Sequence, residues 1–128
     1  KPIGKVCLSG RCAGTERTIS EGNEDRDAWQ VASGCATEAY NVARARGIKL
    51  DFTDPVAYVR AFGMKIPNAR PSMLLDHMAG RMSEIDAING AIPVAAKAAG
   101  VAAPYNDVIG ALVRAKERRM GVRDPAGD

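Results

Sequence analysis

The 128-residue sequence predicts an all-α domain, on three observations. Apolar residues recur at spacings of three and four, the period of an amphipathic helix, and no stretch alternates apolar and polar residues over a useful strand length. Prolines and glycines fall where helices would begin and end. Aromatic residues make up only 5% of the chain while alanine is frequent, which favours closely packed helices over a β-sandwich. We expect one compact domain of about five or six helices.

The first strong helical pattern spans residues 28–46. Its apolar positions follow one another at spacings of four, four and three. They are Val31, Cys35, Ala39 and Val42. The polar run over residues 21–27 is typical of a turn that leads into a helix, and Gly47 is a conventional stop after two arginines. Trp29 is expected to contact the core or a neighbouring helix.

A second, shorter helix is predicted after the Asp-Pro pair at positions 54–55. Aspartate is a good helix cap and proline suits the first turn, so the helix should run to about Phe62 with Gly63 as its end. Residues 64–70 are expected to be extended or looped, because proline disfavours helix in the residue before it.

Two further helices are predicted over residues 71–100. Pro71 suits the first position of one helix and Gly80 suits the left-handed position that ends it. Ser83 can then cap a new helix. The apolar positions of that helix are Ile85, Ile88 and Ile92. Because Pro93 interrupts it, we expect a kink or a local break near residues 89–90.

The last helix is expected from Tyr105 to about Arg119, opened by Pro104. Four apolar residues are predicted to face the core, namely Val108, Ile109, Leu112 and Val113. Residues 121–128 are expected to form a disordered tail. Residues 1–20 carry three glycines, and propensity alone predicts a loop or a frayed helix there.

Composition argues against several classes of partner. The net charge of +3 and the pI near 8.9 are mild for a nucleic-acid binder. The basic run over residues 114–119 is expected from the helix dipole alone, and no aromatic residues interleave with it. Three cysteines without C-x-x-C spacing and a single histidine make no credible metal set. Free thiols in a reducing cytoplasm are the plain interpretation, and no apolar run approaches the roughly 20 residues of a membrane span.

One stretch carries a specific resemblance. Residues 71–90 read PSMLLDHMAGRMSEIDAING. This closely resembles the C-terminal signature of the ketopantoate reductase (2-dehydropantoate 2-reductase) family, in which a PSMLQD-like segment leads into a T/S-E-I-D-x-I-N-G helix. Ser72 and Glu84 are twelve positions apart, as the family's serine and glutamate are. Weaker agreement continues through GVAAPYNDVIGALVRAKE. The resemblance implies an all-α domain similar to the C-terminal domains of 6-phosphogluconate dehydrogenases.

The resemblance also assigns the N-terminal residues. The family opens this domain with a helix that bears a catalytic lysine, followed by asparagines four and eight positions later. Lys5 lies 67 positions before Ser72, close to the family's separation, and is therefore the natural match. The asparagine positions are here Ser9 and Ala13, which puts the identity of the substrate in doubt. Ser9 can still donate a hydrogen bond to a substrate, with a shorter reach, whereas Ala13 cannot.

By resemblance, Lys5 is the general acid, Ser72 binds the substrate carboxylate, and Glu84 is a second catalytic residue. Glu84 would hold the lysine, the substrate hydroxyl or the cofactor in place. Each has a plainer interpretation from the residues alone: a solvated lysine, a local helix-start hydrogen bond, and a glutamate placed favourably by the helix dipole. Structural roles are expected for Asp86 and Asn89, and solvated or capping roles for Asp76 and His77.

Nothing in the sequence can bind a dinucleotide alone, because no glycine-rich turn follows a strand. In the family the nucleotide domain precedes this region, and the active site lies between the two domains. Residues 1–120 are therefore expected to be the substrate-side half of an NADPH-dependent reductase that converts 2-dehydropantoate to pantoate in pantothenate biosynthesis. Its partner is an N-terminal Rossmann domain absent from this chain, and we expect this chain alone to bind no cofactor and to be inactive.

Two alternatives stay open. The glycine-rich N-terminus and the replaced asparagines also fit a non-catalytic helical domain of the same family, kept for interaction or homodimerisation. A divergent member could instead reduce a different 2-keto acid, because fold alone does not fix the substrate.

Overall fold

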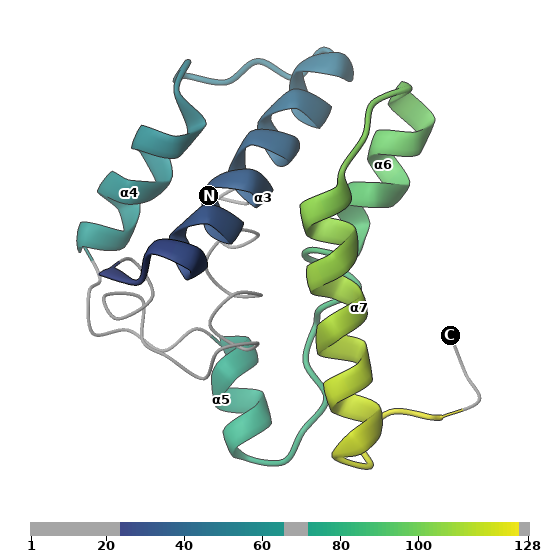
Figure 1. Ribbon diagram of the computed structural model, residues 1–128. Coiled ribbons are helices and arrows are strands. Elements are labelled where there is room, and N and C mark those ends of the chain that lie inside the picture. Colours follow the sequence, from purple (N-terminus) through teal and green to yellow (C-terminus); the bar gives the residue numbers. More distant parts are fainter. Residues whose placement is uncertain (1–23, 66–71, 126–128) are drawn as a thin grey trace.

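The computed structural model describes residues 24–65 and 72–125. The helices within them, labelled as in Figure 1, are α3 (Arg26–Ala45), α4 (Pro55–Lys65), α5 (Ser72–Met78), α6 (Ala91–Ala99) and α7 (Pro104–Arg119). These two segments contain no strand, so the predicted all-α class is confirmed. No helix in the described part of the chain is both long and apolar enough to cross a bilayer.

Helix α3 occupies the centre of the domain. It contacts α4 on one side and both α6 and α7 on the other (Figure 1). Most residues on its buried face are small, which allows neighbouring helices to approach closely. They include Ala28, Ala32, Cys35, Ala36 and Ala39. One such close contact is at Gly34, where a Cβ atom would lie 2.5 Å from the ring of Tyr105 in α7.

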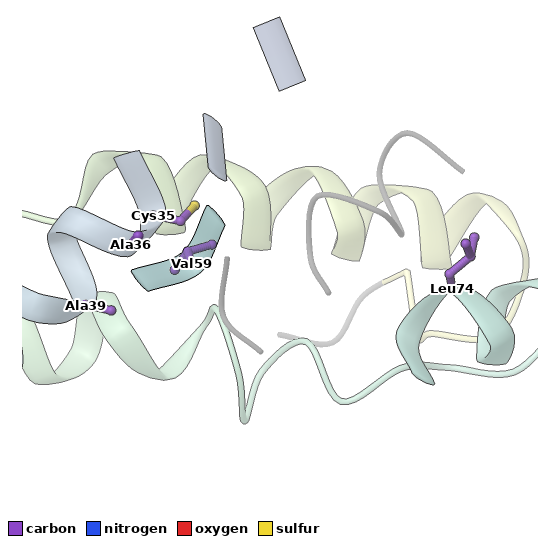
Figure 2. Packing of buried hydrophobic residues seen from close by; sticks show 5 residues of the cluster. All are labelled: Cys35, Ala36, Ala39, Val59 and Leu74. Carbon is purple, nitrogen blue, oxygen red and sulfur yellow. The ribbon is translucent and has the colours of Figure 1, made fainter. Parts of the chain in front are cut away.

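The largest hydrophobic cluster links α3 to α4 and α5. Cys35, Ala36 and Ala39 lie beside Val59 of α4, and Leu74 extends the cluster along α5 (Figure 2). Partly buried aromatic side chains pack around it, namely Trp29, Phe52, Tyr58, Phe62 and Tyr105. The guanidinium carbon of Arg60 in α4 lies 4.1 Å from the centre of the Trp29 ring. The predicted helix contact of Trp29 is therefore confirmed.

Helix ends follow the predicted signals at several places. The carboxylate of Asp25 accepts a hydrogen bond of 2.8 Å from the Ala28 N–H, and that of Asp54 accepts one of 3.0 Å from the Ala57 N–H. Both are N-caps. Gly80 has a φ of 73° and ends α5, with its own N–H bonded to the His77 carbonyl. That left-handed conformation is the reason a glycine stands there.

Two predicted boundaries are wrong. Helix α4 does not end at Gly63, which is buried inside it, because the helix continues to Lys65. No regular helix begins at Ser83 either: residues 84–90 form a series of turns, and α6 begins at Ala91. The kink or break predicted near residues 89–90 is therefore the boundary between these turns and α6. Pro93 is the third residue of α6, where a missing N–H costs no intrahelical bond.

The core-facing stripe of α7 also differs from the prediction. Val113 is buried and Ile109 is partly buried, but Val108 and Leu112 are 57% and 60% exposed. The buried residues of α7 instead recur at spacings of four, three and four, and two of them, Asn106 and Glu117, are polar. The full set is Asn106, Gly110, Val113 and Glu117. A pattern of apolar residues alone could not select this face, because half of it is not apolar.

The tail is ordered where its side chains find partners. Arg123 is buried, with 7% exposure, and its guanidinium pairs with carboxylates of Glu117 and Asp86. The prediction of a disordered tail from residue 121 onward is therefore wrong at Arg123. Residues 126–128 lie outside the described part of the chain.

Candidate functional site

The residues predicted to form the site are only partly described by the structure. Lys5 and Ser9 lie outside the described residues. Ser72 is the first residue of α5, but its side chain lies outside the description. Glu84 is described, exposed, and sits at the start of the turns that lead into α6. The structure thus places Glu84 and the backbone of Ser72, and the roles of all four residues stay predictions.

The backbone around Glu84 is held tightly although its side chain is exposed. Its carbonyl accepts hydrogen bonds from the N–H groups of Ala87 and Ile88, at 3.0 and 3.1 Å. The next residue, Ile85, is fully buried and packs with Met73 of α5 and Val113 of α7. A carboxylate is therefore presented to solvent from a turn whose neighbouring side chain is embedded in the core.

A buried carboxylate fixes the residue before Glu84. Glu117 of α7 is fully buried, and its Oε2 atom accepts the Ser83 N–H at 2.7 Å. The same oxygen lies 2.7 Å from Nε2 of His77 in α5, which must donate because an ionised carboxylate only accepts. The other oxygen, Oε1, accepts from Nε and Nη2 of Arg123 at 3.1 and 3.0 Å. One side chain thus ties α5, α7, the turn and the C-terminal segment together.

These donors decide the charge state of Glu117. Burial by itself raises the pKa of its carboxyl, since removing charge from water is costly. Hydrogen bonds from Ser83, His77 and Arg123 stabilise the charged form more strongly, so the pKa of Glu117 lies below its ordinary value. Glu117 is therefore a buried anion with a buried cation, Arg123, beside it.

A second ion pair fixes the residue two positions after Glu84. The Oδ2 atom of Asp86 lies 3.0 Å from Nη1 of Arg123, and its Oδ1 atom lies 3.4 Å from Nη1 of Arg114. Arg123 thus bridges Glu117 and Asp86. The turn is held on both sides of Glu84 by one guanidinium, directly at Asp86 and through Glu117 at Ser83.

A separate polar network attaches the end of this turn to the start of α7. Glu38 of α3 is buried and accepts hydrogen bonds from the N–H groups of Tyr105 and Asn106, at 2.7 and 2.9 Å. The Asn106 side chain donates to Glu38 at 2.8 Å and accepts from Asn89 at 3.0 Å. A carboxylate at a helix N-terminus is favourable both as a cap and in the dipole field. The structural roles predicted for Asp86 and Asn89 are confirmed.

Two residues of this region were misjudged or missed. His77 was expected to be solvated or capping, but its side chain is only 3% exposed and is bonded to Glu117. In the sequence, Glu117 is one residue of the basic run over residues 114–119, and the pattern gives it no separate role. The available signal was its position four residues after Val113, which places it on the same buried face of α7.

The described residues offer no complete site for a cofactor or a metal. A dinucleotide site of the glycine-rich type needs a strand, a turn and a helix, and residues 24–65 and 72–125 contain no strand. The same residues hold no group of three or more His, Cys, Asp or Glu side chains that could bind a metal ion. What this region can offer chemically is an exposed carboxylate on a fixed backbone, able to accept hydrogen bonds or to pair with a cation.

Comparison with known proteins identifies the family. The model of the family described as "Ketopantoate reductase PanE/ApbA C terminal" matches residues 1–117. The chain belongs to this family. The ketopantoate reductase signature over residues 71–90 is therefore more than a chance resemblance, and the predicted family is confirmed. In the structure, the signature covers α5 and the turns over residues 84–90, and it ends at Gly90, just before α6.

Individual relatives of the chain agree with that assignment. A 2-dehydropantoate 2-reductase from Streptococcus pyogenes serotype M3 is 31% identical over 124 residues, which cover 93% of this chain and 40% of the relative. A ketopantoate reductase structure from Ralstonia eutropha JMP134 superposes with a TM-score of 0.85 at 29% identity, covering 94% of this chain and 40% of that one. A ternary structure of D-mandelate dehydrogenase with NADH and anilino(oxo)acetate also gives a TM-score of 0.85, at 30% identity, covering 95% of this chain and 68% of that one.

The matched relatives are longer than this chain. The chain spans about 40% of the length of the curated relative from Streptococcus pyogenes. The relatives are oxidoreductases in name, and this chain corresponds to one part of them.

Proposed function

We propose that this chain is the substrate-side domain of an NADPH-dependent reductase that converts 2-dehydropantoate to pantoate. The observation that carries the proposal is the family match over residues 1–117. The Ser72 and Glu84 motif supports it, because Glu84 stands exposed on a fixed turn close in sequence to the start of α5. We expect the reaction to take place in the cytoplasm, as a step of pantothenate biosynthesis.

Lys5 is the proposed general acid. When a ketone is reduced, negative charge develops on its oxygen atom. An ammonium group within hydrogen-bonding distance stabilises that charge and then supplies the proton that completes the hydroxyl. A nicotinamide cofactor bound by a separate N-terminal domain supplies the hydride, since the described residues form no dinucleotide site.

Ser72, Ser9 and Glu84 are proposed to hold the substrate. Ser72 begins α5, and a hydroxyl at a helix start suits the carboxylate of a 2-keto acid. Ser9 would donate a second hydrogen bond. Glu84 would accept from the Lys5 ammonium, from a substrate hydroxyl or from the cofactor. Its exposure in the chain alone is consistent with a surface completed by another domain.

The test uses the protein encoded by the complete reading frame. With NADPH and 2-dehydropantoate, we expect substrate-dependent oxidation of the cofactor. The 128-residue chain by itself should show neither NADPH binding nor turnover, because the part of it that the structure describes offers no dinucleotide site. Absence of oxidation with every 2-keto acid tried would overturn the proposal and favour a non-catalytic interaction domain.

A second candidate is a reductase of a different 2-keto acid. Two observations favour it: Ser9 and Ala13 stand at the family's asparagine positions, and the D-mandelate dehydrogenase structure is as similar as the ketopantoate reductase one. A panel of aliphatic and aromatic 2-keto acids, each with NADPH and with NADH, separates the two. The higher kcat/KM identifies the substrate class, since discrimination between substrates is the ratio of these values.

A further inference from the structure

We propose that Glu117 and Arg123 are positioning residues for Glu84. Together they hold the turn that carries Glu84 so that its exposed carboxylate keeps one orientation when the reductase binds its ligands. The inference rests on the proposed function, because that function gives Glu84 its role. Glu117 lies in α7 and Arg123 lies beyond it, and neither is among the residues proposed to touch the substrate.

The residues on both sides of Glu84 are each held by contacts with the rest of the domain. Ser83 is fixed through its N–H to Glu117, Ile85 is fixed by burial, and Asp86 is fixed by Arg123. Glu84 is thus an exposed residue flanked by held ones. A free surface turn has no need of such anchors, because solvent can satisfy its polar groups.

The residues that hold the turn lie far from it in the sequence. Glu117 is in α7 and Arg123 lies six positions beyond it, whereas the turn lies about thirty positions earlier in the chain. Arg123 contacts both flanks, with Nη2 on Glu117 and Nη1 on Asp86. Its side chain is 4% exposed although it carries a full charge. The buried Arg123 guanidinium therefore contacts both Asp86, which follows Glu84, and Glu117, which holds Ser83 before it.

The buried ion pair of Glu117 and Arg123 has an energetic cost. Burying an ion pair removes two charges from water, and well-packed hydrophobic residues often give equal or greater stability. Stability alone is therefore a weak reason for the Glu117 and Arg123 pair. A directional network does fix geometry, and groups that bind reacting ligands must be held to within about 0.5 Å to be effective.

The decisive experiment is a double-mutant cycle in the protein encoded by the complete reading frame. We expect Arg123→Met to lower kcat/KM by roughly ten- to a hundredfold, the range seen when a supporting residue is lost. In a Glu84→Gln background the same change should have little further effect, because the residue it positions is already altered. Arg123→Lys should recover part of the activity. Arg119→Ala changes an exposed cation at the end of α7, is the matched control and should leave kcat/KM unchanged.

Amide hydrogen exchange in the same proteins reports on the turn directly. We expect Arg123→Met to accelerate exchange at residues 83–90 while α3 keeps its protection. If Arg123→Met does not fold, Asp86→Asn tests the same anchor, since Asp86 is 58% exposed at its side chain and the buried Arg123 keeps its pairing with Glu117.

The possible outcomes distinguish failure of the positioning inference from failure of the proposed function. An equal loss of kcat/KM in both backgrounds, or a lower melting midpoint with unchanged kinetics, would make the pair merely structural and overturn the inference. If wild-type protein turns over no 2-keto acid, the proposed function fails and the inference falls with it. If wild-type turnover is normal and exchange in residues 83–90 is unaffected by Arg123→Met, only the positioning inference fails.

Discussion

At the scale of single residues, Glu117 is the clearest case of burial opposed by hydrogen bonding. Its carboxylate has lost contact with water yet keeps its charge, because the Ser83 N–H, the His77 ring and the Arg123 guanidinium all donate to it. The consequence is a depressed pKa and a dependence of folding stability on pH.

The pH dependence has a definite sign. Since the pKa of Glu117 is lower in the folded chain than in the unfolded one, its contribution to stability is fully present above the unfolded pKa, near 4.5. It is lost as pH falls through the lower, folded value. We expect Glu117→Gln to destabilise the protein by about 3 kcal/mol at pH 7, because the buried Arg123 loses its buried anion and keeps the exposed carboxylate of Asp86.

Thermal unfolding of both proteins between pH 7 and pH 3 tests this prediction. The gap between the two melting midpoints should narrow as the solution is acidified. A gap that stays constant over that range would contradict the assigned charge of Glu117. Glu24→Gln, an exposed carboxylate just before α3, is the control and should shift the midpoint little at any pH.

At the scale of helices, α7 is attached to the rest of the domain at both ends by buried carboxylates. Glu38 of α3 caps its first turn, and Glu117 fastens its last turn to α5 and to the Glu84 turn. Between them, a close contact with α3 at Gly34 sets the distance between the two helices.

The Asn106 side chain should be essential at the first of these attachments. Asn106→Ala would leave both Asn89 and Glu38 with a lost buried partner, and we expect a loss of about 1–3 kcal/mol in the free energy of unfolding. Urea denaturation measures it. Asn41→Ala changes an exposed asparagine of α3 and should cost little. Equal losses for the two variants would contradict the described network.

The spacing of α3 and α7 predicts a contrast between two glycines. Gly34→Ala would place a Cβ 2.5 Å from the Tyr105 ring, so we expect destabilisation of about 1–3 kcal/mol despite alanine's better helix propensity. Gly110→Ala meets only the end of the flexible Arg114 side chain and should be near neutral or stabilising. If Gly34→Ala is the better tolerated of the two in urea denaturation, the packing of these helices is wrong.

The elements that could be predicted from sequence are those set by local signals. The cap at Asp54, the polar run that contains Asp25 and the glycine stop at Gly80 depend only on nearby residues. The sequence therefore predicts α3, α5 and α7 close to their observed positions. The turn over residues 84–90 could not be predicted in this way. Its isoleucines are spaced as in a helix, but the turn is held from another part of the chain, by Glu117 at the Ser83 N–H and by Arg123 at the Asp86 carboxylate.

At the scale of the whole molecule, the domain presents an exposed carboxylate and exposed apolar residues to its surroundings. Glu84 is exposed, and Val108 and Leu112 of α7 are more than half exposed. The motif could be found from sequence because its polar residues lie within twenty positions of one another. The supporting pair of Glu117 and Arg123 could not, since only the fold brings it to the turn.

The measurement that tests the central claim most directly compares two lysine variants of the protein encoded by the complete reading frame. Lys5→Ala removes the proposed general acid, and Lys1→Ala removes a neighbouring lysine with no proposed role. We predict that kcat for NADPH-dependent reduction of the best 2-keto acid falls about 10²- to 10⁴-fold in Lys5→Ala and is unchanged in Lys1→Ala. Equal activity in the two variants would contradict the claim that this chain supplies the proton in a 2-keto acid reductase.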